Sequence, residues 1–208
     1  MYMSCMKILR LCFLQSTKRS KEMVFGFPRS VGLGFGTSSH VQNMLPRNRG
    51  GYAGVYPSWE LFCSYLCTDG LPIDESPLFD PSKPFENRDP RCTATIVEFE
   101  KPHLGVIYDP NPLSTKVLNI ITGKMISNKD TRAVATYASY NGLLWKKGVD
   151  ESWLENAYQI EPDYVIIRYA DVLLMYAEAK TELGQMNEAV WNLSLIHISE
   201  PTRLDVIS

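Results

Sequence analysis

The clearest hydrophobic pattern along the chain lies near its C-terminal end. Between residues 164 and 183, apolar residues recur at the spacing of one helix face, at Ile166, Ala170, Leu173, Leu174 and Ala177. Asp163 is suited to cap the start of this helix, and Gly184 is suited to end it. A second helical pattern begins near Asn187. We therefore predict an antiparallel helix pair over about residues 164–183 and 187–192.

This predicted pair has the layout of one tetratricopeptide-like hairpin: a helix, a glycine-containing turn, and a second helix with an early alanine. A single hairpin cannot bury its own apolar face, so such hairpins need stacked neighbours. The rest of the sequence shows no further hairpin of this kind. We therefore expect the chain to be a fragment of a longer protein.

The remaining patterns predict short elements separated by long irregular stretches. A short helix is expected over residues 58–65, because Ser58 can cap it and Leu61, Phe62 and Tyr65 share one face. The β-branched residues 93–99 predict a strand, and residues 136–148 predict one or two more. Residues 68–91 combine several prolines with Asp, Asn and Ser, which argues against a regular element. The predicted fold class is mainly α with minor β: a tetratricopeptide-like helix hairpin plus irregular loops and short strands.

Composition and charge narrow the functional classes. The 208 residues are 45% apolar and 21% charged, which suits one soluble core, and no apolar run is long enough to span a membrane. Residues 1–50 hold eight Lys or Arg and one acid, Glu22, but the bases are scattered apart from residues 18–21. We interpret them as solvated and expect no nucleic-acid partner. No export signal is readable, because Arg10 interrupts the first apolar stretch and the bulky Leu11 precedes Cys12.

The reactive side chains do not form a recognisable catalytic or metal-binding pattern. Five cysteines argue against a disulfide framework, and the three histidines lie at no metal-ligand spacing relative to Cys63 and Cys67. Four acids crowd the loop 68–91, at Asp69, Asp74, Glu75 and Asp80. They could serve glycoside hydrolysis or bind calcium, but local turn bonds to backbone N–H groups are the favoured interpretation. We expect no enzyme activity, no cofactor and no metal.

Three segments together resemble the SusD/RagB family. They are "GGYAGVYPSWELFCSYLCTDGLPIDES" (residues 50–76), "PFENRDPRCTATI" (84–96) and "IIRYADVLLMYAEAKTELG" (166–184). The resemblance divides the chain into an unstructured start over residues 1–20, a partial SusD/RagB-like domain over 21–192, and a tail over 193–208. That tail, "LSLIHISEPTR" and onward, looks like a translated sequencing adapter and is expected to pack poorly.

The resemblance implies ligand binding rather than catalysis. Members of the family are surface-exposed lipoproteins of the outer membrane in Bacteroidetes-type bacteria, where they bind oligosaccharides and pass them to a SusC-like TonB-dependent transporter. On this basis we expect a glycan-binding accessory protein for nutrient uptake, without catalysis or cofactor. The alternative is a tetratricopeptide-like protein-interaction fragment without a sugar site.

Two groups of residues are candidates for the site and its support. Sugars are bound by aromatic faces, and Tyr52, Tyr56 and Trp59 lie in or beside a Gly-rich loop, although each could instead be a core residue. The second group is the motif Asn87, Arg88, Asp89, Pro90 and Arg91, together with Arg168 and Asp171. Its charges could contact a ligand, but we favour an internal ion-pair network that joins the loop to the helix beginning near Arg168.

Overall fold

The computed structural model describes residues 21–34 and 39–191. The predictions for residues 1–20 and for the adapter-like tail 193–208 therefore lie outside the described residues, as does the last residue of the predicted second helix.

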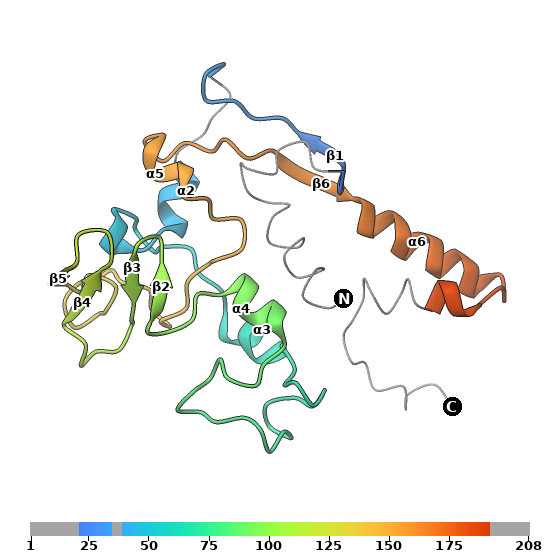
Figure 1. Ribbon diagram of the computed structural model, residues 1–208, viewed down its shortest axis with the longest axis horizontal. Coiled ribbons are helices and arrows are strands. Elements are labelled where there is room, and N and C mark those ends of the chain that lie inside the picture. The colour runs from blue at the N-terminus through green and yellow to red at the C-terminus, as the bar shows by residue number, and fades with distance from the viewer. Residues whose placement is uncertain (1–20, 35–38, 192–208) are drawn as a thin grey trace.

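Two antiparallel sheets form the β part of the described chain (Figure 1). The larger is a four-stranded meander in the order β2-β3-β4-β5, made of Lys101–His103, Val106–Tyr108, Lys116–Asn119 and Lys124–Ser127. The smaller pairs β1 (Met23–Phe27) with β6 (Tyr164–Arg168). β1 and β6 are far apart in sequence, so this ribbon joins the two ends of the described chain.

The helices are short, with one exception. They are α2 (Ser39–Met44), the 3-10 helix η2 (Arg47–Arg49), α3 (Trp59–Ser64), α4 (Pro90–Thr95), α5 (Ser152–Glu155) and α6 (Tyr169–Glu182). Within residues 21–34 and 39–191, only α6, with 14 residues, exceeds two turns. The predicted mainly α fold class is therefore wrong: the described chain is a mixed structure with two antiparallel sheets. The missed sheet arises from short apolar stretches between tight turns, which carry no helical period.

The long C-terminal helix begins later than predicted. Residues 164–168 form β6 instead, because their β-branched side chains suit a strand and β1 supplies the partner. The helix is capped at Arg168, whose backbone N–H donates to the Asp171 carboxylate (2.7 Å). Asp163, the predicted cap, instead accepts a hydrogen bond from the Arg29 backbone (3.0 Å).

The end of α6 is as predicted. Gly184 has φ +65°, and the N–H groups of Gly184 and Gln185 donate to the carbonyls of Thr181 and Lys180, both at 2.9 Å. This is the paired pattern of a Schellman cap, which favours glycine. A second helix begins at Asn187, whose side chain accepts from the Val190 N–H (3.0 Å), and it turns back beside the end of α6 (Figure 1).

The other predicted elements have mixed outcomes. The short helix after Ser58 is confirmed, with the Ser58 hydroxyl accepting from the Leu61 N–H (3.1 Å). The strand predicted over 93–99 is wrong, because Asp89 and Pro90 begin α4, which runs to Thr95. Residues 136–148 form turns, with a single bridge between Ile96 and Trp145 in place of further strands.

The interior consists of three small apolar clusters rather than one large core. They are centred on Val41, Leu45 and Trp153, on Val97, Tyr108 and Leu144, and on Phe62, Ile96 and Leu143. These clusters hold the short helices against the meander, while β1, β6 and α6 extend to one side of this body (Figure 1). No helix among the described residues is both long and apolar enough to cross a bilayer.

Candidate functional site

A groove of about 750 Å³ lies on the body of the protein between α3, the start of the meander and the loop before Trp145. Six separate stretches of the chain contribute to it. Its lining comprises Trp59, residues 82–86, residues 98–101, residues 109–112, and Arg132 with residues 139–142. Of the three predicted sugar-binding aromatics, the groove includes only Trp59.

Trp59 packs at the end of a row of aromatic rings. Trp59 meets Phe62 edge to face at 5.0 Å between centroids, Phe62 meets Phe85 at 5.1 Å, and Phe85 meets Phe99 at 5.0 Å. Such edge-to-face pairs are favourable beyond the area they bury. Phe62 is buried, whereas Trp59 is 42% exposed. The row therefore holds the indole firmly while leaving much of its surface open to the groove.

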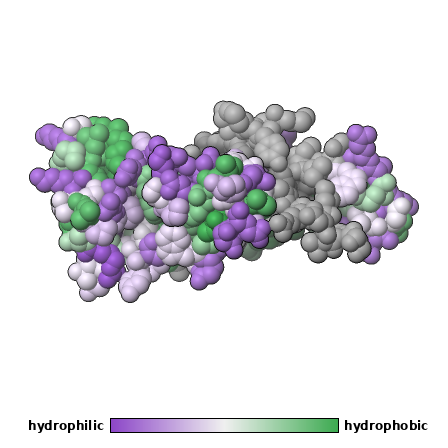
Figure 2. Space-filling model, turned by 90° about the horizontal axis from the view of Figure 1, so that it is seen from below, coloured by the Kyte–Doolittle hydropathy of each residue, from purple (hydrophilic) through white to green (hydrophobic). Residues whose placement is uncertain are grey.

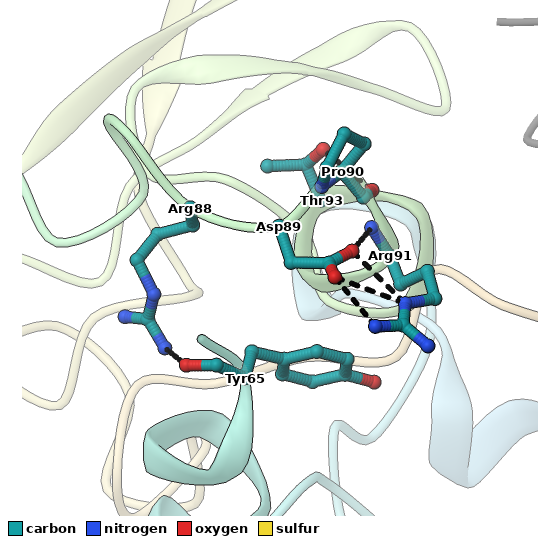
Figure 3. A network of polar contacts seen from close by, with 6 residues as sticks. All are labelled: Tyr65, Arg88, Asp89, Pro90, Arg91 and Thr93. Carbon is teal, nitrogen blue, oxygen red and sulfur yellow. Dashed lines mark hydrogen bonds and ion pairs between the residues drawn. The ribbon is translucent and has the colours of Figure 1, made fainter. Parts of the chain in front are cut away.

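Arg88 binds the chain segments that carry this row of rings. Its guanidinium is 4% exposed and donates to the carbonyl oxygens of Phe62 (2.6 Å), Tyr65 (2.9 Å) and Pro84 (3.1 Å). It also lies over the Phe62 ring, 4.5 Å from the centroid. Figure 3 shows the side chain reaching toward Tyr65, away from α4. Arg88 thus ties the loop that carries Phe85 to the helix that carries Trp59.

The rest of the Asn87–Arg91 motif builds the turn into α4. Asn87 has φ +55° and donates to the Leu78 carbonyl (3.0 Å). Asp89 caps α4 by accepting from the Arg91 N–H (2.8 Å), and it binds the Arg91 guanidinium at 2.6 Å (Figure 3). Pro90 occupies the first turn, where its missing N–H costs nothing. These charges pair within the motif itself.

The predicted network between this motif and the helix near Arg168 is replaced by two separate arrangements. Arg168 lies at the other end of the structure, where its guanidinium is 3.8 Å from Glu22. Asp171 caps α6 beside it. The Glu22 carbonyl also accepts the Tyr169 N–H (2.7 Å). Arg168 and Asp171 therefore join β1 to α6 and do not line the groove.

A hydrogen-bonded loop that carries Tyr140 forms another part of the groove lining. Asn141 donates to the Pro57 carbonyl (2.7 Å), and the Ser139 hydroxyl donates to the Leu143 carbonyl (2.7 Å). The buried Tyr108 hydroxyl donates to the carbonyl of Gly142 (2.9 Å), which has φ +76°. These bonds hold the loop at both ends. Tyr140, between them, is 75% exposed.

Arg132 lines the groove beside Tyr140. Its guanidinium lies over the Tyr140 ring, 4.7 Å from the centroid. A cation stacked on one face of a ring fixes the ring and leaves the other face open. The sequence pattern did not predict Tyr140, because residues 136–148 were expected to form strands, and it did not predict Arg132, which lies before that range. The signal that was available is the "YNG" turn, which places an aromatic residue next to a glycine turn.

The charges around the groove are largely balanced. Glu98 pairs with Lys146 (3.3 Å), and Glu86 pairs with Lys83 (3.4 Å). Asp109 is buried and accepts from the Asn111 N–H (3.0 Å). The groove therefore combines two exposed rings with polar side chains of both signs, and no single charge dominates it.

Tyr52 and Tyr56 lie outside the groove lining. Tyr52 is exposed and Tyr56 is half-buried. The glycines before them approach their own chain closely: a side chain at Gly50 would collide with the Tyr158 hydroxyl, and one at Gly51 with the Leu45 carbonyl. The Gly-rich stretch therefore serves packing of the loop at these two positions.

The acidic loop behaves as a set of turns. Asp69 accepts from the Leu71 N–H (3.1 Å), and Asp80 accepts from the Ser82 N–H (2.8 Å), which confirms the predicted local turn bonds. The Ser76 hydroxyl lowers the pKa of Asp69, and the Ser82 hydroxyl lowers the pKa of Asp80. The described residues contain no group of three or more His, Cys, Asp or Glu side chains placed to bind a metal ion.

Comparison with known proteins identifies the family. The model of the SusD family matches residues 21–198, which is most of the chain and extends past residue 192, the predicted end of the domain. The chain belongs to the SusD family. Comparison with curated proteins found no match.

Two solved structures from Bacteroides fragilis share the fold. A SusD-like carbohydrate-binding protein is 26% identical, with a TM-score of 0.64, and the match covers 91% of this chain. A second SusD-like protein is 20% identical, with a TM-score of 0.54 and 93% coverage. The matches span only 36% and 39% of those two solved chains. This SusD family chain thus corresponds to little more than a third of each of those proteins.

Proposed function

We propose that the groove binds an oligosaccharide, with Trp59 and Tyr140 as its stacking faces. The observation that supports this most is the pair of exposed rings in one groove lining, with Trp59 packed on the buried Phe62 and Tyr140 stacked on Arg132. Rigid aromatic side chains give a large contact area at a low cost in conformational entropy. Membership of the SusD family and the likeness to a SusD-like carbohydrate-binding protein support the same conclusion.

The wider role follows from the family as a proposal. The protein acts without catalysis as a glycan-binding accessory lipoprotein at the outer-membrane surface of a Bacteroidetes-type cell. It delivers its ligand to a SusC-like TonB-dependent transporter. In this proposal residues 21–192 form a partial SusD/RagB domain, and residues 193–208 are an adapter-derived tail. The part of the groove described above is then one portion of a larger binding surface.

An interaction fragment without a sugar site is the second candidate function. One observation favours it: α6 exposes several large apolar side chains, including Val172, Met175 and Tyr176. Contiguous exposed apolar surface is typical of interaction sites. The tetratricopeptide-like interpretation of α6 and the following helix requires further stacked hairpins, which the described residues do not include.

Alanine substitutions at the two rings separate these functions. Trp59→Ala and Tyr140→Ala should each weaken binding of a neutral oligosaccharide by roughly 1–3 kcal/mol, by analogy with bases stacked on aromatic side chains. Isothermal titration calorimetry against a panel of gluco-, manno- and xylo-oligosaccharides measures this. Because both rings are exposed, the melting temperature should change little.

Tyr52→Ala is the matched control, since Tyr52 is a similarly exposed aromatic outside the groove lining. It should leave affinity unchanged. If Trp59→Ala and Tyr140→Ala also leave affinity unchanged while the protein binds a glycan, the groove is not the site. If the unchanged protein binds no glycan in the panel, the interaction function is favoured instead.

A further inference from the structure

The β4–β5 hairpin exposes an apolar face outside the groove lining. In its register, Leu118 lies opposite Met125, and their side chains share one face of the ribbon because strand side chains alternate. The other face carries Val117, which is buried, and Ile126, which is half-buried. The ribbon therefore has an inner side packed on the protein and an outer side on which Met125 is 60% exposed.

The tip of the hairpin adds two exposed isoleucines, which the backbone holds in place. The Ile120 N–H donates to the Gly105 carbonyl (2.9 Å), and the Ile121 N–H donates to the Asn119 side chain (3.0 Å). Ile121 crosses over Gly105, where any side chain would collide with it, yet Ile121 remains 65% exposed. The apolar tip is thus a fixed protrusion rather than a loose loop.

Three lysines lie on or next to this hairpin: Lys116 shares the outer face with Leu118, Lys124 lies beside the tip at the start of β5, and Lys129 follows β5. The hairpin itself contains no acid, and the two acids that flank residues 110–129, Asp109 and Asp130, are buried. All three are exposed, and none has an ion-pair partner among the residues that the structure describes. Figure 2 shows apolar surface next to hydrophilic side chains at the end of the molecule that carries this hairpin.

We propose that this outer face of the β4–β5 hairpin docks on a bilayer surface that carries anionic headgroups. Aliphatic side chains surrounded by lysines fit that surface, because apolar groups enter the interface while each lysine near it adds electrostatic attraction. A protein partner is the weaker match. Protein interfaces are enriched in aromatic residues and arginine and depleted in lysine, whereas the hairpin has lysines and neither an aromatic residue nor an arginine.

Vesicle co-sedimentation of the 208-residue chain tests this. We expect binding to vesicles of phosphatidylcholine with 30% phosphatidylglycerol, weaker binding to pure phosphatidylcholine, and a loss of binding as salt is raised. Replacing all three hairpin lysines with glutamine should weaken binding about a hundredfold, at roughly fivefold for each lysine. The double variant Ile120→Ser, Ile121→Ser should also weaken vesicle binding. The dependence of that binding on salt should stay the same, because the lysines are unchanged.

Two matched controls make the result specific. Glutamine at Lys21, Lys83 and Lys180 changes the net charge equally but lies outside the hairpin, and serine at Val172 and Met175 removes exposed apolar groups from α6. Neither should change vesicle binding, and circular dichroism should show every variant folded. Binding that survives both hairpin variants, or no binding to anionic vesicles at all, overturns the proposal. A dimer in analytical ultracentrifugation that the Ile120→Ser, Ile121→Ser variant abolishes would instead assign the face to a second copy.

Discussion

The body of the protein and its extension are built in different ways. In the body, buried polar groups bond to main-chain atoms of distant segments: Arg88 binds three carbonyls, and Asn128 binds the carbonyls of Asp109 and Ser114. In the extension of β1, β6 and α6, large apolar side chains such as Phe25, Phe27 and Tyr164 remain exposed. The shape of the body is therefore specified by internal polar contacts, whereas the extension depends on the β1–β6 ladder, the caps of α6 and the contacts of Glu22.

The difference in construction between the body and the extension matters for ligand binding. A binding surface needs side chains that are held in place before the ligand arrives, because ordering them afterwards reduces affinity. The body provides that for Trp59 and Tyr140. The extension offers exposed apolar surface on a two-stranded ribbon, which is only marginally stable without further packing. The body therefore meets this requirement for the proposed sugar site better than the extension does.

The largest expected effect is the loss of Arg88. Arg88→Ala removes the donors of three carbonyls around α3, and unsatisfied buried acceptors cost roughly 1–3 kcal/mol each. We expect the free energy of unfolding to fall by about 3 kcal/mol or more, measured by urea denaturation. Arg88→Lys should recover little of it, since a single ammonium cannot reproduce the fork of a guanidinium.

Arg132→Ala is the control for that change, because Arg132 is an exposed arginine of the same body that stacks on Tyr140. It should alter stability by less than about 0.5 kcal/mol. Equal losses from Arg88→Ala and Arg132→Ala would contradict the view that buried main-chain contacts specify the body.

The second effect is a pH dependence centred on Asp130. Asp130 is 2% exposed and accepts from the N–H groups of Arg47 and Asn48, and burial raises its pKa from 3.8 to about 6. The folded state thus holds this proton more tightly than the unfolded chain does. Between about pH 4 and pH 6 the free energy of unfolding should fall as pH rises, by up to about 3 kcal/mol.

Asp130→Asn isolates this contribution, because asparagine keeps an oxygen acceptor for Arg47 and Asn48 but does not titrate. Urea denaturation of both proteins at several pH values from 4 to 7.5 should give a flatter profile for Asp130→Asn. Identical slopes would mean that Asp130 does not titrate in this window.

The smallest effect compares two helix caps. Asp89→Ala removes the α4 cap and its bond to Arg91, and should cost about 1–2 kcal/mol. Asp171→Ala removes the bond at the start of α6 and should cost about 0.5–1 kcal/mol. Hydrogen exchange should show the first loss throughout the body and the second only in α6. If Asp171→Ala also loosens the body, the two regions are more tightly coupled than the contacts indicate.

Local features were predictable from the sequence, and those assembled over long distances were not. Ser58 and Gly184 were assigned correctly because a cap depends on neighbours within one turn. The strand β6 was not, because its partner β1 lies about 140 residues earlier and the same residues also fit a helical period. A strand's pairing is a tertiary property that local spacing does not contain.

The candidate site shows the same division. Trp59 was predicted because it is an aromatic residue beside a Gly-rich loop. Tyr140 and Arg132 reach the groove through bonds of Asn141 to Pro57 and of Tyr108 to Gly142, and these links join segments far apart in sequence. Arg88 was expected to be structural, but the carbonyls it binds could not be named before the fold was known.

The irregular loop of residues 68–91 has a consequence for enzymatic digestion. It has no named strand or helix before Pro90, so it would be expected to be a target for proteases. Trypsin cleaves after basic residues, and this stretch has three: Lys83, Arg88 and Arg91. Lys83 precedes a proline, the Arg88 side chain is buried, and Arg91 lies in α4 with its guanidinium on Asp89. Trypsin should therefore leave this loop uncut while the body is folded.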